Sequence, residues 1–213
     1  MPKVYPSGCR LKRTLWQNRN LEETMQFNRD EAWKLLNEFT TNPSLIKHGL
    51  SVEAAMRAYA RYFGEDEETW SIVGLIHDFD YEQNPTESTH LHVGCAILSE
   101  REWPEDWILA VGSHADYMGI PRDTPMRKAL FAVDELTGFL TACALVRPDK
   151  SIADVRIKSV KKKLKDKAFA RAVNRNDVYT GAEALGVELG DHIERVRDAM
   201  ATISEELGLP GTS

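Results

Sequence analysis

The chain has 213 residues, of which 42% are hydrophobic and 28% charged, an ordinary balance for one large globular domain. No run approaches the roughly 18 apolar residues that a membrane-spanning helix needs, and the polar, proline-broken segment Met1 to Arg10 does not resemble a signal peptide. Three scattered cysteines are too few for a disulfide framework, so we expect a cytoplasmic protein with no membrane association.

The net charge of −6 is unevenly distributed along the chain. Residues 156–175 contain nine Lys or Arg and one Asp, a local charge of +8, so the rest of the chain carries −14, the difference between −6 and +8. An acidic body with one basic segment argues against specific nucleic-acid binding. It is compatible with a local site for phosphate or another anion.

Helical periodicity dominates the chain after residue 27. Residues 1–27 contain five basic side chains and no clear period, and are predicted to form an N-terminal extension. The first helix is predicted to begin after Asn28, an N-cap with Glu31 three residues further on, and to end at Phe39. Later helices are predicted at residues 44–63, 67 to about 79, 90–101, 104–117, 124–146, 152–173, 176–185 and 189–207. No run alternates with period two over a convincing length, so the chain is predicted to be all-α.

Six polar residues lie within or next to apolar helical segments: His48, His77, Asp78, His90, His114 and Asp134. Imidazole and carboxylate are the ligands that borderline and hard divalent cations prefer. The His77-Asp78 pair ends a strongly apolar segment, where two titratable groups cost free energy unless they are paired or bind a metal. Asp134 lies in the most apolar stretch, where a cation or a salt bridge would stabilise it. His48, His77, Asp78 and Asp134 therefore predict one metal site with open positions for water and substrate.

Any single histidine on a helix is more often a surface or hydrogen-bonded core residue than a ligand. His92 is accordingly interpreted as a surface residue or as one that supports a ligand. His192 lies among charges in the last predicted helix and is expected to be solvated.

The order His, His-Asp, His, His, Asp resembles the HD-domain superfamily of metal-dependent phosphohydrolases, in particular its HDIG-type branch. The resemblance covers roughly residues 44 to 145. In that branch a histidine four residues before a glycine follows the His-Asp pair, as His90 precedes Gly94 here, and another histidine precedes a glycine-containing loop, as His114 precedes Gly119. The resemblance implies an HD-domain-like helical bundle with a metal site in its core, formed by residues 28–150 and completed by the C-terminal helices of residues 151–213.

The resemblance also implies which ligands hold which ion. His48, His77, Asp78 and Asp134 would hold a first metal, and His90 and His114 would contribute to a second, with Asp78 between the two ions. One or two divalent ions are expected per chain, and Mn, Fe, Co, Ni, Zn or Mg would suit these ligands.

Two departures from the family pattern limit the resemblance. Phe79-Asp80 stands where the branch is named for Ile-Gly, and the loop after Gly119 lacks the Gly-Tyr-Pro signature of the cyclic-di-GMP enzymes. Hydrolysis of cyclic-di-GMP is therefore not supported.

The implied activity is hydrolysis of a phosphate ester of a nucleotide or other small phosphorylated metabolite by water activated on the metal. Asp80 and Asp116 are the candidates for orienting that water or protonating the leaving group. Lys161, Lys165 and Arg122 are the candidates for binding the substrate phosphate, although a solubilising surface explains most lysines of this segment equally well.

Two other functions are compatible with the same ligand set. The first is a di-iron oxygenase of the HD fold, which iron content and an oxygen-dependent reaction would reveal. The second is a nucleotide-sensing module that binds without turnover, although its degenerate relatives typically lose ligands. A homodimer is compatible with the sequence, which shows no heptad seam.

Overall fold

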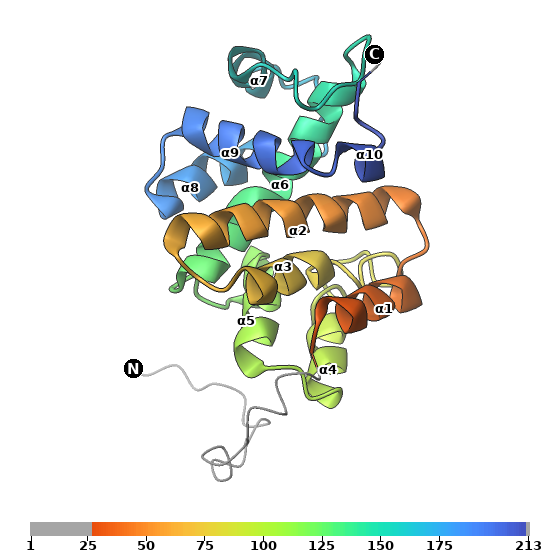
Figure 1. Ribbon diagram of the computed structural model, residues 1–213. Helices are drawn as coiled ribbons and strands as arrows, with labels where there is room; N and C mark the ends of the chain where they lie inside the picture. The colour runs from red at the N-terminus through yellow and green to blue at the C-terminus, as the bar shows by residue number, and fades with distance from the viewer. Residues whose placement is uncertain (1–26, 212–213) are drawn as a thin grey trace.

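The computed structural model describes residues 27–211. Within them every regular element is a helix and none is a strand, which confirms the predicted all-α class. The predicted extension at residues 1–27 lies outside the described residues except for Phe27. The elements, in chain order and labelled as in Figure 1, are α1 (Arg29–Phe39), α2 (Pro43–Phe63), α3 (Glu67–Ile76), α4 (His92–Glu100), α5 (Glu105–Ser113), the short 3-10 helix η2 (Asp116–Met118), α6 (Pro125–Leu145), α7 (Ile157–Leu164), α8 (Arg175–Leu185), α9 (Leu189–Ala201) and α10 (Ser204–Leu207).

Capping residues fix several of the predicted helix ends. The side chain of Asn28 accepts a hydrogen bond of 3.0 Å from the N–H of Glu31 and so caps α1, as predicted. Helix α2 ends at Gly64, whose φ of 72° lies in the left-handed region that glycine adopts with least strain. Asp66 caps α3 by accepting a hydrogen bond of 2.8 Å from the N–H of Thr69.

Helix α2 runs through the middle of the molecule, with other helices packed on both sides of it (Figure 1). It packs against α3 on one side and against α6 and α9 on another, while α6 in turn packs against α8 and α5. Helices α2 and α6 have 21 residues each. Neither these two nor any other described helix has an apolar stretch long enough to cross a membrane.

One hydrophobic core joins the two parts of the chain on either side of residue 150. Val160, Val178, Ile193 and Met200, from the C-terminal helices, belong to the same buried cluster as the apolar residues of α1 to α6. The C-terminal segment therefore covers α2 and α6 rather than forming a core of its own.

Glycines permit the closest helix packing. A Cβ at Gly74 on α3 would lie 2.9 Å from Cγ of Met56 and 3.0 Å from the backbone oxygen of Val52 on α2. A Cβ at Gly181 on α8 would lie 2.6 Å from the Cα of Ala132 on α6. The backbones of these helix pairs approach each other so closely that no side chain fits between them.

The helix predicted at residues 152–173 is much shorter in the structure, where only α7 (Ile157–Leu164) is helical. The hydroxyl of Ser151 accepts a hydrogen bond of 3.2 Å from the N–H of Asp154, which forms a turn before α7. After α7, the Arg175 guanidinium binds the backbone oxygens of Phe169 and Ala170 and holds this segment in a non-helical path. Side-chain bonds to the backbone thus override the periodic pattern.

Three further helices end earlier than predicted. Helices α3 and α5 stop at Ile76 and Ser113, because His77 and His114 act as their C-caps. The segment predicted as one helix at residues 189–207 is divided between α9 and α10. The two histidines at helix ends are also predicted metal ligands, so these early stops bear on the site.

The close approach of α6 and α8 yields a stability prediction. Gly181→Ala is expected to lower the free energy of unfolding by about 1–3 kcal/mol, because its methyl group would overlap the Ala132 backbone. Gly138→Ala in α6 is the control, since its Cβ would meet no atom within 4 Å, and it is expected to stabilise the helix by about 0.5–1 kcal/mol. Urea denaturation of both variants measures the difference, and equal stability would contradict the packing account.

Candidate metal centre

The structure brings all six predicted ligands to one place between the helices, in two groups of three whose ligand atoms lie within 4.8 Å of one another: His48, His77 and Asp134, and Asp78, His90 and His114. They come from five elements that are distant in the sequence. His48 is on α2, His77 caps α3, Asp78 follows it, His90 precedes α4, His114 caps α5 and Asp134 is on α6.

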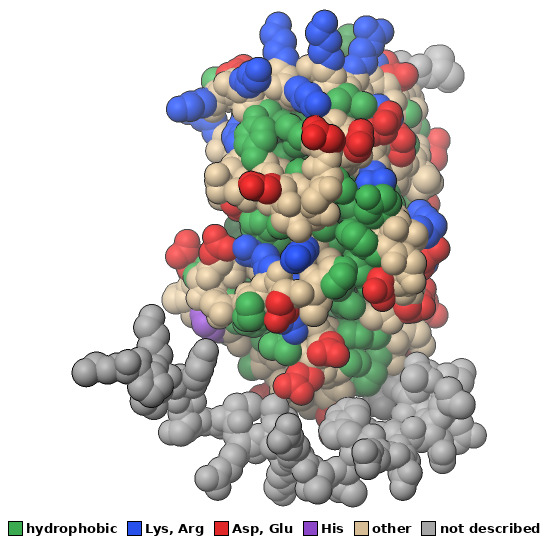
Figure 2. Space-filling view, turned by 90° about the vertical axis from the view of Figure 1, so that its left-hand side faces the viewer, with side chains coloured by type: hydrophobic (Ala, Val, Ile, Leu, Met, Phe, Trp, Pro, Cys, Tyr) green, Lys and Arg blue, Asp and Glu red, His purple; other side chains and the backbone are tan. Residues whose placement is uncertain are grey.

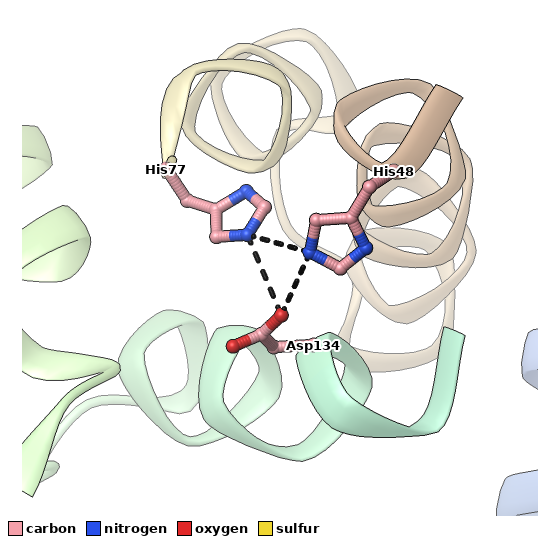
Figure 3. A group of neighbouring side chains, drawn as sticks. All are labelled: His48, His77 and Asp134. Atoms are coloured by element: carbon pink, nitrogen blue, oxygen red, sulfur yellow. Dashed lines mark hydrogen bonds and ion pairs between the residues drawn. The ribbon is translucent and has the colours of Figure 1, made fainter. Parts of the chain in front are cut away.

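The first group joins α2, α3 and α6 (Figure 3). Nε2 of His48 lies 3.0 Å from Oδ1 of Asp134 and 3.2 Å from Nε2 of His77. Nε2 of His77 lies 3.5 Å from the same Asp134 oxygen. Two imidazole nitrogens and one carboxylate oxygen therefore point at a common centre from three helices.

The second group forms around one oxygen of Asp78. Its Oδ1 lies 3.2 Å from Nε2 of His90 and 3.3 Å from Nε2 of His114. The other oxygen, Oδ2, faces the first group and lies 3.5 Å from Nε2 of His77 and 3.8 Å from Nε2 of His48. Asp78 therefore presents one oxygen to each group.

The buried Oδ1 atom of Asp78 makes no hydrogen bond to any described residue, although two imidazole nitrogens lie nearby. Burying an anionic oxygen without a partner is costly. The two imidazole nitrogens lie 3.2 and 3.3 Å from this oxygen without forming a hydrogen bond to it, so a cation between the three atoms would satisfy them better than they satisfy one another. The residues present therefore suit one or two divalent ions.

Backbone carbonyls orient two of the imidazoles. Nδ1 of His77 donates to the carbonyl of Gly74 at 2.8 Å, and Nδ1 of His114 donates to the carbonyl of Val111 at 2.7 Å. Each acceptor is three residues earlier, among the carbonyls that a helix C-terminus leaves unpaired. These partners assign the ring proton to Nδ1 and direct the lone pair of Nε2 into the site.

Side chains orient the other two imidazoles. Nδ1 of His90 donates to Oδ1 of Asp80 at 3.0 Å. Nδ1 of His48 lies 3.4 Å from the hydroxyl oxygen of Thr137, which itself donates to the backbone oxygen of Asp134. All four histidines thus have an Nδ1 partner outside the centre.

Asp80, a predicted proton-transfer residue, is fully buried and does not line the cavity beside the ligands. Its Oδ2 accepts hydrogen bonds of 3.1 Å from the N–H groups of Leu91 and Gly94, while Oδ1 accepts from His90. This corrects the prediction: Asp80 orients His90 and cannot reach a substrate. A Cβ at Gly94 would lie 2.8 Å from Cγ of Asp80, so the glycine of the His90 motif admits this carboxylate.

Asp116, the other predicted proton-transfer residue, does line the cavity. Its side chain is 81% exposed and forms an ion pair of 2.7 Å with Arg122. Arg122 also donates to the backbone oxygens of Ser113 and His114, at 2.7 and 3.0 Å. Arg122 does not itself line the cavity, but it anchors the loop that follows α5 and lies at the edge of the cavity, with its guanidinium carbon 3.6 Å from the ring centre of Phe131. Its assignment to substrate phosphate stays a prediction.

Lys161 and Lys165, the other predicted phosphate ligands, are exposed and do not line the cavity either. Helix α7 packs against α9 and buries Val160 and Leu164, so its lysines face solvent. The structure thus gives no support to a phosphate clamp by these lysines, and the solubilising interpretation of this face agrees with it.

A cavity of about 530 Å³ opens beside the two groups. Five of the six ligands line it, and His77 lies behind them. Asp116, which the sequence had suggested, also lines the cavity. Sequence patterns did not indicate the other lining residues, which come from separate segments: Leu45, Tyr81, Glu87, Ala115, Tyr117, Phe131, Glu135, Gly138, Asn174 and Asp177. Among these, Glu135 could have been suspected, because it follows Asp134 directly in the sequence.

The two remaining histidines lie outside the centre. His92 is exposed, in agreement with its interpretation as a surface residue. His192 is fully buried, so the expectation of a solvated side chain is wrong. Its Nδ1 accepts a hydrogen bond of 2.5 Å from the hydroxyl of Tyr59, and its Nε2 donates to the carbonyl of Ala132 at 3.0 Å. Burial lowers the pKa of His192 to about 4, and the histidine links α9 to α2 and α6 as a neutral group.

Comparison of the chain with protein-family models, with curated proteins and with solved structures found no match.

The charges of the centre shift its own pKa values. Burial disfavours the imidazolium form of His90, but the carboxylates of Asp78 and Asp80 beside its two ring nitrogens outweigh burial and raise its pKa to about 9. The pKa values of His77 and His114 are also raised, because nearby carboxylates outweigh burial. The pKa of Asp78 is held well below its usual range, since the surrounding imidazoles outweigh burial.

These shifts predict that metal affinity depends on pH. A divalent cation competes with protons for the same Nε2 atoms, and the raised pKa values favour the protons at low pH. The apparent affinity is therefore expected to rise between pH 6 and pH 9 and then level off. Calorimetric titration with Mn²⁺ in buffers of different ionisation enthalpy measures affinity and proton release together; binding without proton release would contradict this arrangement.

The contact between Asp80 and His90 predicts a selective loss of metal. Asp80→Asn is expected to lower the affinity of the group Asp78, His90 and His114 for a divalent ion by about 10- to 100-fold, because His90 loses its anionic partner. The ion held by His48, His77 and Asp134 should be retained. Metal titration followed by elemental analysis distinguishes the two, and unchanged affinity of both ions would show that Asp80 does not support His90.

Proposed function

We propose that the protein is a metal-dependent phosphohydrolase of the HD-domain type that hydrolyses a phosphate ester of a small metabolite. The observation that carries this proposal is the placement of Asp78, whose two oxygens face two separate groups of ligands beside a cavity. Paired metal sites with a shared ligand are typical of enzymes that displace a phosphate ester oxygen.

The helical architecture supports the same proposal. The ligands follow the order of the HD-domain superfamily, and each lies on a helix or at a helix end of an all-helical chain. The glycine of the His90 motif has a physical role, since Gly94 admits the carboxylate that orients His90. The family-like spacing therefore corresponds to contacts that position the ligands.

His48, His77, Asp134 and one oxygen of Asp78 would hold one divalent ion, and His90, His114 and the other oxygen of Asp78 a second. When bound, the ions supply hydroxide at neutral pH by lowering the pKa of water and neutralise charge on the phosphoryl oxygens.

The chain's own residues contribute orientation and hydrogen bonding. The Nδ1 partners of the histidines hold the imidazoles in place before any substrate arrives, so little reorganisation accompanies the reaction. Asp116 is the predicted proton-transfer residue that reaches the cavity, and its ion pair with Arg122 holds it at the mouth. As an ionised carboxylate, Asp116 would accept a hydrogen bond from the attacking water or from the substrate at the mouth of the cavity.

The activity is tested on protein reconstituted separately with Mn²⁺, Fe²⁺, Co²⁺, Ni²⁺ and Zn²⁺ and assayed for phosphate release from p-nitrophenyl phosphate and a panel of small phosphate monoesters. Release that requires a metal and proceeds equally with and without oxygen is the expected result. Turnover only with iron and oxygen would instead support an oxygenase, and binding of nucleotides without turnover would support a sensing module.

Substitution of the ligands yields a fourth prediction. Asp78→Ala and His77→Ala are each expected to lower phosphatase activity by more than about 100-fold, with the helical circular dichroism spectrum retained. Loss of a residue that only orients a ligand typically costs about 10- to 100-fold. His92→Ala is the matched control, because His92 is exposed and does not line the cavity. Equal activity of the Asp78→Ala and His92→Ala variants would contradict the assignment of Asp78 as a metal ligand.

A further inference from the structure

We propose that the cavity selects a phosphate ester that carries one phosphate and, at its other end, an ammonium group. This inference rests on the proposed phosphohydrolase function and names its substrate class. It is argued from the charge of the side chains that line the cavity around the six ligands.

No Lys or Arg lines this cavity within residues 27–211. Lys161 and Lys165 lie on the solvent face of α7, and Arg122 lies at the edge of the cavity, where its charge is paired with Asp116. Figure 2 shows Lys and Arg side chains gathered at the top of the molecule, the end at which Figure 1 places α7. A substrate with several phosphates would therefore find no unpaired cationic side chain among the lining residues.

Carboxylates line the cavity instead. Besides the ligands, Glu87, Asp116, Glu135 and Asp177 line it, and only Asp116 forms an ion pair, with Arg122, within the described part of the chain. Glu135 and Asp177 each accept a hydrogen bond from Asn174, at 3.1 and 2.7 Å, but Asn174 brings no positive charge. Burial raises the pKa of Glu135 to about 7, so Glu135 is only partly ionised at neutral pH. The negative charge of the outer cavity therefore comes mainly from Glu87 and Asp177, which have no cationic partner in the described part of the chain.

Two neighbouring groups respond to this negative charge. Burial raises the pKa of Tyr117 to about 12, and the carboxylates of Asp78, Asp80 and Glu87 add to the shift. Burial and then the charge of Asp116 raise the pKa of Asp177. A second anionic group on a substrate would meet the same repulsion.

The charges of the centre account for one phosphate and no more. The ligand carboxylates Asp78 and Asp134 would offset half of the charge of two divalent ions, and a single phosphate dianion would offset the other half. An ammonium group on the substrate would then offset part of the negative charge of the remaining rim carboxylates.

Aromatic rings at the mouth suit such a cation. Tyr81 and Tyr117 line the cavity and are each 38% exposed, so part of each ring is accessible to a ligand. The face of a tyrosine ring attracts an ammonium group, and a neighbouring carboxylate such as Glu87 strengthens the attraction. Rings and carboxylates together therefore form the type of surface that binds organic ammonium groups.

The test compares three esters that each carry one phosphate: O-phosphoethanolamine, with an ammonium group, glycerol 3-phosphate, with none, and 3-phosphoglycerate, with a carboxylate. For protein loaded with Mn²⁺, kcat/KM is expected to be at least about tenfold higher for the ammonium ester than for the neutral one, and lowest for the carboxylate ester. Hydrolysis with no preference, or with the carboxylate ester preferred, would overturn the inference and leave the phosphohydrolase function standing.

Variants of the rim test whether its carboxylates cause the preference. Glu87→Gln combined with Asp177→Asn is expected to lower kcat/KM for O-phosphoethanolamine about tenfold through KM, with less than about a twofold change for glycerol 3-phosphate. Glu183→Gln is the control, since Glu183 is exposed on the same helix as Asp177 and does not line the cavity. An equal loss for both esters would overturn the inference.

A binding measurement keeps the inference testable if the protein hydrolyses none of the esters. That outcome would contradict the phosphohydrolase function alone. Calorimetry would then compare O-phosphoethanolamine with glycerol 3-phosphate on the Mn²⁺-loaded protein, with the ammonium ester expected to bind at least about tenfold more tightly, and the rim variant expected to remove the difference. If the ammonium ester did not bind more tightly than glycerol 3-phosphate, the inference would be overturned, whether or not the protein is a phosphohydrolase.

Discussion

The placement of the Asp78 carboxylate between two groups of histidines is the constraint on which the rest of the site depends. One of its oxygens is buried without a hydrogen bond, and the other faces the opposite group. Such an arrangement is costly in an apolar core unless a positive charge compensates it. The helices that meet here, α2, α3, α5 and α6, are held together by the core around them, so the packing energy of the whole domain maintains the arrangement.

Two helix ends show how the backbone prepares this site. His77 and His114 each cap a buried helix and donate Nδ1 to a carbonyl three residues earlier. A single hydrogen bond thus satisfies a carbonyl at the helix C-terminus and turns Nε2 towards Asp78. His90 receives the same orientation from Asp80, a carboxylate held by two backbone N–H groups at the start of α4. The ligands are therefore positioned by secondary structure as well as by side-chain contacts.

The cluster of His48, His77, Asp78 and Asp134 could be predicted because polar residues in apolar helical segments are conspicuous, whereas His90 and His114 were indicated by the resemblance to the HD-domain pattern. The helix ends at Asn28 and Gly64 could be predicted because their signals are local. The wall of the cavity could not be predicted, since Tyr81, Tyr117 and Asp177 lie on exposed segments that only tertiary packing brings together. The orientation of the α7 lysines could not be predicted either, because residue type and spacing show that a face is basic but not which way the helix turns it.

The measurement that tests the central claim most directly is a crystal structure of the Mn²⁺-loaded protein with anomalous diffraction data. The account predicts two anomalous peaks, one among His48, His77 and Asp134 and one between His90 and His114, with the Asp78 carboxylate between them. Peaks elsewhere, or no peak among these residues at saturating Mn²⁺, would show that the six side chains form a structural network and would contradict the account.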